Sequence, residues 1–161
     1  MLLVVASMPW QKEGLRAVSP AADRFALVEV AVRDVDGLEA SSLEIDRGGP
    51  SYTADTLEEI HRHWPTDELF LVLGADAAAG IDTWERPGRM AELATLVLVD
   101  RPGEWTPPPA RFRWKRIAIP ALEVSSTDLR QRVAAGRPID FLTAHRVVTS
   151  IAERHLYRVA E

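Results

Sequence analysis

The sequence predicts an α/β fold, a doubly wound and mostly parallel sheet with helices on both faces, in a single domain over residues 1–161. Short aliphatic and β-branched runs alternate with segments of helical spacing along almost the whole chain. Continuous apolar runs of this kind are typical of parallel strands that helices cover on both faces. The composition, 47% hydrophobic and 27% charged, is that of one ordinary globular domain.

Five apolar runs are expected to be strands. All are far shorter than the about 20 apolar residues that cross a bilayer, so no membrane partner is expected. The first run has no basic residue before it and is followed at once by Pro9 and Trp10, which favours a buried strand over a secretion signal. The expected strands are 2–6, 38–45, 69–73, 96–99 and 117–119.

Residues that cap or end helices predict where the helices lie. Ser19 as N-cap, with Pro20 at the first helical position, opens a helix over 21–32. Apolar residues recur at helical spacing over 51–64, and Pro65 ends that helix. Two more helices are expected, from Ser125 to Gly136 and over 143–155, and the proline-rich residues 103–110 are expected to form an exposed loop.

Charge and cysteine usage narrow the function classes. The formal net charge of −5 argues against non-specific nucleic-acid binding, but not against nucleotides, which need only a local basic site. The absence of cysteine excludes disulfides, thiolate metal sites and cysteine nucleophiles, and suits a cytoplasmic protein. His61 and His63 lie two apart on a helix and face different ways. His145 and His155 have no partner at ligand spacing, so no metal site formed by the protein is expected.

Ligands of an open α/β sheet bind at the carboxyl ends of its strands, so the residues after each expected strand are the candidates. Lys12 follows the first strand and could place a positive charge on a phosphate. Two glycines precede Ser51 and Thr53, where the start of a helix could hold an anion. Each has a structural alternative that the local sequence favours, a solvated lysine in one case and a turn with a cap at Ser51 or Thr53 in the other.

Two further segments are candidates. Asp76, after the third strand, could bond a ribose, and Trp84 could stack on a heteroaromatic ring. Residues 125–130 open a helix with hydroxyls, free amides and an arginine about one turn later, which suits a phosphate. The structural alternatives are a helix cap for Asp76, a core or rim aromatic for Trp84, and a plain N-cap with a surface arginine for residues 125–130.

Taken together, the order and spacing of these segments resemble the bacterial nicotinate-nucleotide adenylyltransferases, a branch of the nucleotidyltransferase superfamily that carries an H-x-G-H signature. The resemblance implies a Rossmann-like nucleotidyltransferase that transfers AMP from ATP to nicotinate mononucleotide in NAD biosynthesis, forming nicotinate adenine dinucleotide and pyrophosphate. Trp84 and residues 50–53 disfavour a related pantetheine-phosphate or nicotinamide-mononucleotide enzyme. The matching segments are 9–12, 46–56, 74–76, 83–84, 100–103, 124–130 and 155–157.

The resemblance also implies roles for single residues. Thr53 and the adjoining backbone would take the nicotinate carboxylate, Trp84 would stack on the pyridine ring, and Asp76 would contact the ribose. Such enzymes use no protein nucleophile: the mononucleotide phosphate attacks ATP, whose phosphates carry Mg²⁺, and the protein positions groups and neutralises charge. The implied nicotinate mononucleotide site is Thr53, Ala54, Asp76, Trp84 and Glu85, and the implied ATP-phosphate site is Lys12, Ser125, Ser126, Thr127 and Arg130.

One part of the family pattern has no counterpart. Family members begin with a strand and a glycine-rich turn whose H-x-G-H histidines contact the ATP phosphates, whereas Met1 falls where their second strand starts. Gln11 and Glu85 also stand where the family often has histidine and tyrosine. We therefore expect an N-terminally incomplete domain, without the family's first strand and helix and without an identifiable catalytic residue, and a longer functional protein. The alternative is a non-catalytic or degenerate nucleotide-binding homologue, and the sequence leaves open whether the chain forms a homo-oligomer.

Overall fold

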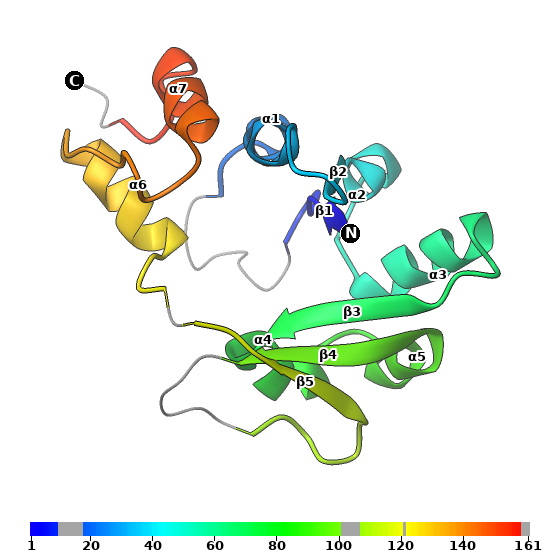
Figure 1. The fold of residues 1–161 in the computed structure, drawn as a ribbon. Coiled ribbons are helices and arrows are strands. Elements are labelled where there is room, and N and C mark those ends of the chain that lie inside the picture. The colour runs from blue at the N-terminus through cyan, green and yellow to red at the C-terminus, as the bar shows by residue number, and fades with distance from the viewer. Residues whose placement is uncertain (10–17, 101–106, 121, 159–161) are drawn as a thin grey trace. The chain divides into compact units, whose positions relative to one another are not determined.

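The computed structural model describes residues 1–9, 18–100, 107–120 and 122–158, which form two compact units. The first unit comprises Met1–Pro50 and Glu123–Glu161, and the second comprises Ser51–Leu122. Both contain parallel strands and helices (Figure 1), which confirms the expected α/β class with parallel pairing. The expectation of a single domain over the whole chain stays a prediction.

A short parallel pair forms the sheet of the first unit. β1 (Leu2–Val4) pairs with β2 (Glu39–Ser41), and the amide of Val5 extends the ladder by donating to the Ser41 carbonyl at 3.0 Å. α1 (Ala21–Val32) lies between the two strands in the chain and packs on β2. A parallel pair requires such a crossover connection, so the expected first strand and first helix are confirmed as a strand–helix–strand unit.

The expected strand 38–45 is wrong over its second half, because Leu43–Arg47 form the helix α2. The Ser42 hydroxyl donates to the Asp46 carboxylate at 2.7 Å, and the Ser42 carbonyl accepts the Asp46 amide at 2.9 Å. Gly48, at φ 70°, then ends the helix in a conformation that glycine adopts without steric cost. A local hydroxyl–carboxylate pair and a glycine stop thus outweigh the apolar pattern of this run.

α1 has the expected bounds, but the expected cap is wrong, because Pro20 and not Ser19 occupies the N-cap position. The carbonyl of Ser19, the expected N-cap, accepts from Arg24 Nε at 3.0 Å. The same guanidinium donates to the carbonyls of Ala6 at 2.6 Å and Ser7 at 2.9 Å, and its burial lowers the pKa of Arg24. Arg24 therefore fastens the first turn of α1 to the chain that follows β1.

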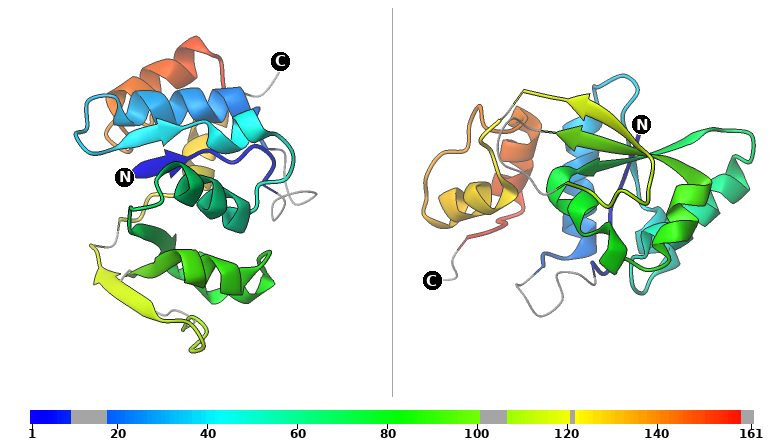
Figure 2. Two further views of the ribbon diagram at one scale, coloured as in Figure 1. Left: turned by 90° about the vertical axis from the view of Figure 1, so that its right-hand side faces the viewer. Right: turned by 90° about the horizontal axis from the view of Figure 1, so that it is seen from below.

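Two helices complete the first unit, α6 (Ser126–Ala134) and α7 (His145–Glu153). Both match the expected C-terminal helices to within a few residues, and Gly136, at φ 66°, follows α6 as expected. α7 lies alongside α1 in both views of Figure 2, and Arg154 Nη1 donates to Asp23 Oδ1 of α1 at 2.7 Å. The C-terminal helices are thus part of the same unit as the N-terminal strand pair.

Three parallel strands form the sheet of the second unit, in the order β3–β4–β5. They are β3 (Leu69–Gly74), β4 (Ala94–Asp100) and β5 (Trp114–Ala118). The last strand, expected over 117–119, begins instead at Trp114, where it pairs with Leu96 of β4, and ends at Ala118. Lys115 extends over the face of the Phe70 ring, 4.8 Å from its centroid.

The expected proline-rich loop is described from residue 107 onward. Residues 107–109 form neither helix nor strand, and Ala110 is an exposed turn residue. The Trp114 indole donates to the Pro109 carbonyl at 3.2 Å, which attaches this end of the loop to the start of β5.

The second unit has four helical segments in its described residues. α3 (Thr53–His63) precedes β3, whereas α4 (Ala75–Ala79), the 3₁₀ turn η2 (Ile81–Thr83) and α5 (Pro87–Leu93) lie between β3 and β4. The sequence predicts only α3, over 51–64, because the other three are too short to show a helical period. None of the helices in the described ranges is long and apolar enough to cross a membrane.

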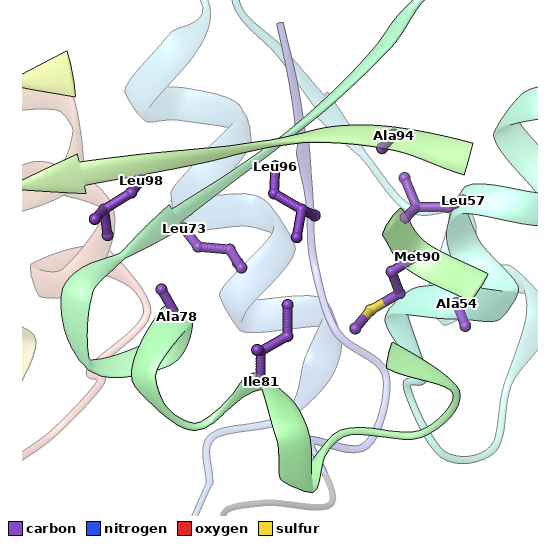
Figure 3. Packing of buried hydrophobic residues seen from close by; sticks show 9 residues of the cluster. All are labelled: Ala54, Leu57, Leu73, Ala78, Ile81, Met90, Ala94, Leu96 and Leu98. Atoms are coloured by element: carbon purple, nitrogen blue, oxygen red, sulfur yellow. The ribbon is translucent and has the colours of Figure 1, made fainter. Parts of the chain in front are cut away.

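The core of the second unit joins these helices to β3 and β4 (Figure 3). Ile81 and Met90 are fully buried in it, so truncating either to alanine is expected to cost about 2–5 kcal/mol of stability. The core thereby fixes the positions of η2 and α5 against α3. This also fixes the position of residues 84–86, which connect η2 to α5. The cluster consists of Ala54, Leu57, Leu73, Ala78, Ile81, Met90, Ala94, Leu96 and Leu98.

Candidate functional site

The three strands of the second unit end at a common carboxyl edge. Gly74 of β3 lies opposite Val99 of β4, and Asp100 lies opposite Ala118 of β5, so the three strands end together. α5 ends directly before β4, and α3 leads through a short connection into β3, so both helices run back against the strands (Figure 1). Asp76, in the first turn of α4 directly after β3, therefore lies at the edge where α/β sheets bind ligands.

α3 begins with amides that have no helical acceptor. Its N-cap is Tyr52, whose side chain makes no capping bond, and the first helical hydrogen bond runs from the Thr56 amide to the Tyr52 carbonyl at 3.2 Å. The structural alternative that placed a cap at Ser51 or Thr53 is therefore wrong. The preceding amides of Thr53 and Ala54 point out of the helix start, where amide donors and the helix dipole favour a carboxylate or phosphate.

The Ala54 side chain is buried and cannot contact a ligand. It is 0% exposed and belongs to the core cluster. Only its backbone amide can face a ligand. Its burial also fixes the first turn of α3 on the core, which keeps the two amides in place.

Asp76 lies in the first turn of α4, immediately after β3. It is not a helix cap, because Gly74 occupies that position. Its side chain is exposed and makes no hydrogen bond or ion pair with another residue in the described ranges. The carboxylate is thus available to accept hydrogen bonds from the hydroxyls of a sugar.

Trp84 closes η2 and packs partly against the core. Its amide donates to the Ile81 carbonyl at 3.0 Å, and the Thr83 hydroxyl donates to the Gly80 carbonyl at 2.8 Å. The structural reading of Trp84 as a rim aromatic therefore holds. It does not exclude stacking, since the ring is half-buried and the following residue, Glu85, is exposed.

Arg86, which the sequence reasoning missed, connects the Trp84 turn to α3. Its guanidinium pairs with Asp55 in the first turn of α3 and with Glu58 one turn later, the latter at 3.1 Å. Arg86 is the N-cap of α5 and adopts the left-handed conformation, at φ 48° and ψ 56°, which costs a non-glycine residue roughly 1–2 kcal/mol. A chain separation of 31 positions between Arg86 and Asp55 hides the pair from inspection of the sequence.

A second arginine extends this contact. Arg89 Nε donates to Glu58 at 2.9 Å, and Arg89 Nη1 donates to Glu92 at 2.9 Å. The hydrogen bond from Arg89, followed by the charge of Arg86, lowers the pKa of Glu58. The carboxylates of Glu58 and then Glu92 raise the pKa of Arg89. We call Asp55, Glu58, Arg86 and Arg89 the α3–α5 ion network.

The candidate phosphate residues lie at the start of α6 in the first unit. Ser125 is the N-cap, and its hydroxyl accepts from the Asp128 amide at 3.1 Å, so the structural reading of Ser125 as a cap is confirmed. Ser126 and Thr127 follow in the first turn and are exposed. Arg130 Nη2 donates to the Thr127 hydroxyl at 3.2 Å, which holds its guanidinium at the helix N-terminus. The hydroxyls, amides and cation therefore converge within one turn, as an anion site requires.

The remaining candidate, Lys12, lies outside the described residues. Glu85 is described and exposed, with no polar partner in the parts of the chain that the structure covers. No three histidine, aspartate or glutamate side chains are grouped to hold a metal ion among the described residues, which contain no cysteine. The structure thus brings together Thr53, Ala54 and the Trp84 turn in one unit, and Ser125, Ser126, Thr127 and Arg130 in the other.

Comparisons with known proteins assign the chain to one family. A family model described as cytidylyltransferase-like matches residues 1–132. The chain is 42% identical to a "probable nicotinate-nucleotide adenylyltransferase" of Corynebacterium kroppenstedtii over 161 residues, which cover 98% of this chain and 76% of the relative. A protein of the same name from Frankia alni is also 42% identical, over 98% of this chain and 84% of that protein.

Solved structures show the same fold. A nicotinic acid mononucleotide adenylyltransferase of Plasmodium falciparum, complexed with NaAD, superposes with a TM-score of 0.76 at 16% identity, over 97% of this chain and 81% of the other. Its complex with APC gives a TM-score of 0.73 at 15% identity, with the same coverage. At this level of identity the likeness is one of fold.

Proposed function

The chain belongs to the nicotinate-nucleotide adenylyltransferases of the cytidylyltransferase-like family, and we propose that it transfers AMP from ATP to nicotinate mononucleotide. The products are nicotinate adenine dinucleotide and pyrophosphate. The observation that carries the substrate assignment is the start of α3, where the amides of Thr53 and Ala54 have no helical acceptor. The ion pair between Asp55 and Arg86 joins this helix start to the turn that contains Trp84. Amide donors for a carboxylate, together with an aromatic ring, suit a nicotinate group.

Each residue of the second unit has a binding role in this proposal. The amides of Thr53 and Ala54 receive the nicotinate carboxylate, and the Trp84 indole stacks on the pyridine ring. Asp76 accepts hydrogen bonds from ribose hydroxyls, which its unpartnered carboxylate can do without losing another contact. Glu85 lines the rim next to Trp84.

The start of α6 has the matching role for ATP. Ser126 and Thr127 offer hydroxyls and amides to phosphate oxygens, Ser125 holds the helix start in shape, and Arg130 adds the positive charge. Lys12 is proposed as a further phosphate ligand. ATP enters as its Mg²⁺ complex, so the metal is part of the substrate and neutralises charge on the phosphates.

The reaction needs no covalent intermediate with the protein. An oxygen of the mononucleotide phosphate attacks the α-phosphorus of ATP, the bond to the β-phosphate oxygen breaks, and pyrophosphate leaves with that electron pair. The protein's contribution is to align the two phosphates and to stabilise the charge that develops on them. This is why binding residues, and no nucleophile or proton-transfer pair, are the assigned groups.

An assay of the full 161-residue chain tests the proposal. The chain is incubated with MgATP and nicotinate mononucleotide, and pyrophosphate and dinucleotide are measured, with nicotinamide mononucleotide as the matched control. We expect dinucleotide formation with a preference for the acid over the amide. Binding of nicotinate mononucleotide by calorimetry without turnover would instead assign the non-catalytic homologue, and no binding of either substrate would reject both functions.

A further inference from the structure

Arg86 connects the two parts of the nicotinate subsite but has no binding role in the proposed function. It lies two residues beyond Trp84, and its partner Asp55 lies two residues beyond Thr53, so one ion pair joins the two parts of the nicotinate subsite. Arg86 Nη1 also reaches Glu58 at 3.1 Å, so the guanidinium spans the first and second turns of α3. The backbone of Arg86 is in the left-handed conformation, which an arginine seldom adopts unless its surroundings impose it.

We propose that Arg86 is a positioning residue of the nicotinate subsite, which holds the Trp84 turn on α3 and neutralises the Asp55 carboxylate beside the open amides. This inference rests on the proposed function, because it concerns how the subsite distinguishes an acid from an amide. Arg86 itself does not touch the substrate. It acts through Trp84 and through Asp55.

The charge of Asp55 is the first reason. Asp55 is the third residue of α3, where a carboxylate is attracted to the same amides and helix dipole that the nicotinate carboxylate would use. Left alone, it would repel a bound carboxylate and compete with it for donors. Arg86 pairs with Asp55, so the pair is neutral as a whole and the amides stay open to the ligand.

The path of the chain is the second reason. From Trp84, at φ −80° and ψ 158°, the chain turns through the left-handed Arg86 into α5, whose first residue is Pro87. Without the contacts to Asp55 and Glu58, nothing among the described contacts of the Arg86 side chain would favour this conformation over others. A different conformation at Arg86 would move Trp84 relative to the start of α3.

Arg89 offers a matched control. It is an arginine on the same helix with the same Glu58 partner, at 2.9 Å, and is similarly exposed, 42% against 41% for Arg86. It has no contact with Asp55 and lies within α5 instead of at its start. Loss of Arg89 therefore weakens the α3–α5 ion network without releasing the Trp84 turn or the Asp55 charge.

The test compares Arg86→Asn with Arg89→Gln in the full chain. Asparagine tolerates the left-handed conformation, so Arg86→Asn removes the guanidinium without adding backbone strain, and a thermal melt checks that both variants fold. Affinity for nicotinate mononucleotide and nicotinamide mononucleotide is measured by calorimetry, and KM and kcat by pyrophosphate release. We expect Arg86→Asn to weaken nicotinate mononucleotide binding about five- to tenfold and to lower the acid-to-amide ratio, with kcat and the KM of ATP nearly unchanged. Arg89→Gln should stay within about twofold of the parent.

A second substitution separates charge from position. In the double variant Arg86→Asn with Asp55→Asn, the repelling carboxylate is gone, so the acid-to-amide ratio should recover while a loss common to both mononucleotides remains. Fluorine NMR of 5-fluorotryptophan protein, with the Trp84 signal assigned through Trp84→Phe, reports the turn without any ligand. This signal should shift or broaden in Arg86→Asn and stay unchanged in Arg89→Gln.

Each outcome decides the proposal. Equal behaviour of Arg86→Asn and Arg89→Gln, no recovery of the acid-to-amide ratio in the double variant, or an unchanged Trp84 signal in Arg86→Asn would overturn it. A parent chain that binds neither mononucleotide would overturn the proposed function instead. In that case the Trp84 signal still decides whether Arg86 holds the turn.

Discussion

Two helix starts of this molecule are suited to anions, and they are held in different ways. At α6, the cap Ser125 and the cation Arg130 both come from the helix itself and its adjoining residue. At α3, the N-cap Tyr52 makes no side-chain cap, and the cation that balances Asp55 is Arg86, 31 positions away in the chain. One start is therefore complete in a local stretch of sequence, and the other is completed only by tertiary packing.

This difference predicts how the structure of each helix start responds to amino-acid substitutions elsewhere in the chain. The α6 start needs only that the helix forms, because its cap, hydroxyls and arginine are neighbours along one turn. The α3 start needs α5 packed on α3, which depends on the shared core that contains Ala54, Leu57 and Met90 (Figure 3). The nicotinate subsite should thus be the more sensitive of the two to changes far from it in sequence.

Replacement of Trp84 should have the largest effect on the α3 side. Loss of a stacked ring costs about 1–3 kcal/mol, so Trp84→Ala should raise the KM for nicotinate mononucleotide roughly 10- to 100-fold while the KM for ATP changes little. Steady-state kinetics with each substrate varied in turn measures this. Trp64→Ala, at the opposite end of α3 and 49% exposed, is the matched control and should leave both values near those of the parent. A larger effect on ATP than on the mononucleotide would reject the assignment of Trp84.

Replacement of Arg130 should produce the converse pattern. Because its guanidinium lies at the start of α6, Arg130→Ala should raise the KM for ATP about tenfold and leave that for nicotinate mononucleotide within about twofold. Arg132→Ala on the same helix, whose partner is Asp128 at 2.8 Å, controls for loss of a positive charge. If Arg132→Ala matched Arg130→Ala, the effect would be one of net charge and not of position.

The Ser125 cap should contribute about 1 kcal/mol to stability, and its loss tests whether the α6 start is locally built. Ser125→Ala should lower the free energy of unfolding by that amount in urea titrations. Ser125→Asp keeps a capping oxygen and should retain most of the stability, yet raise the KM for ATP because it adds a negative charge beside the phosphates. Equal stability of all three proteins would show that the helix start does not depend on the cap.

The same difference explains what could be predicted from the sequence. The α6 start could be predicted because Ser125 and Gly136 are local signals that mark the two ends of one helix. The helix at 43–47 and the short α5 could not, since a side-chain pair or a core contact decides them and neither leaves a period in the sequence. Arg86 could not be assigned to the site because its partner lies in a different helix.

Glu58 provides the smallest but most specific probe of the α3–α5 contact. The hydrogen bond from Arg89, and then the charge of Arg86, place the pKa of Glu58 below its usual value of about 4.3. A carboxyl whose pKa is lower in the folded than in the unfolded state stabilises the fold above the unfolded pKa and loses that contribution as the pH falls through the folded one.

The difference in unfolding free energy between the parent and Glu58→Gln should therefore be present at pH 7 and decline as the pH falls from about 4.3, the unfolded pKa, through the lower folded pKa. The difference should be small, and smaller still in about 0.5 M salt, because the Arg86, Arg89 and Glu58 side chains are 29–42% exposed and solvent screens them. Urea unfolding at a series of pH values measures it. A difference that did not decline at all with falling pH would assign the contribution of Glu58 to packing on α5 and not to charge, and would weaken the view that ion pairing fastens the Trp84 turn to α3.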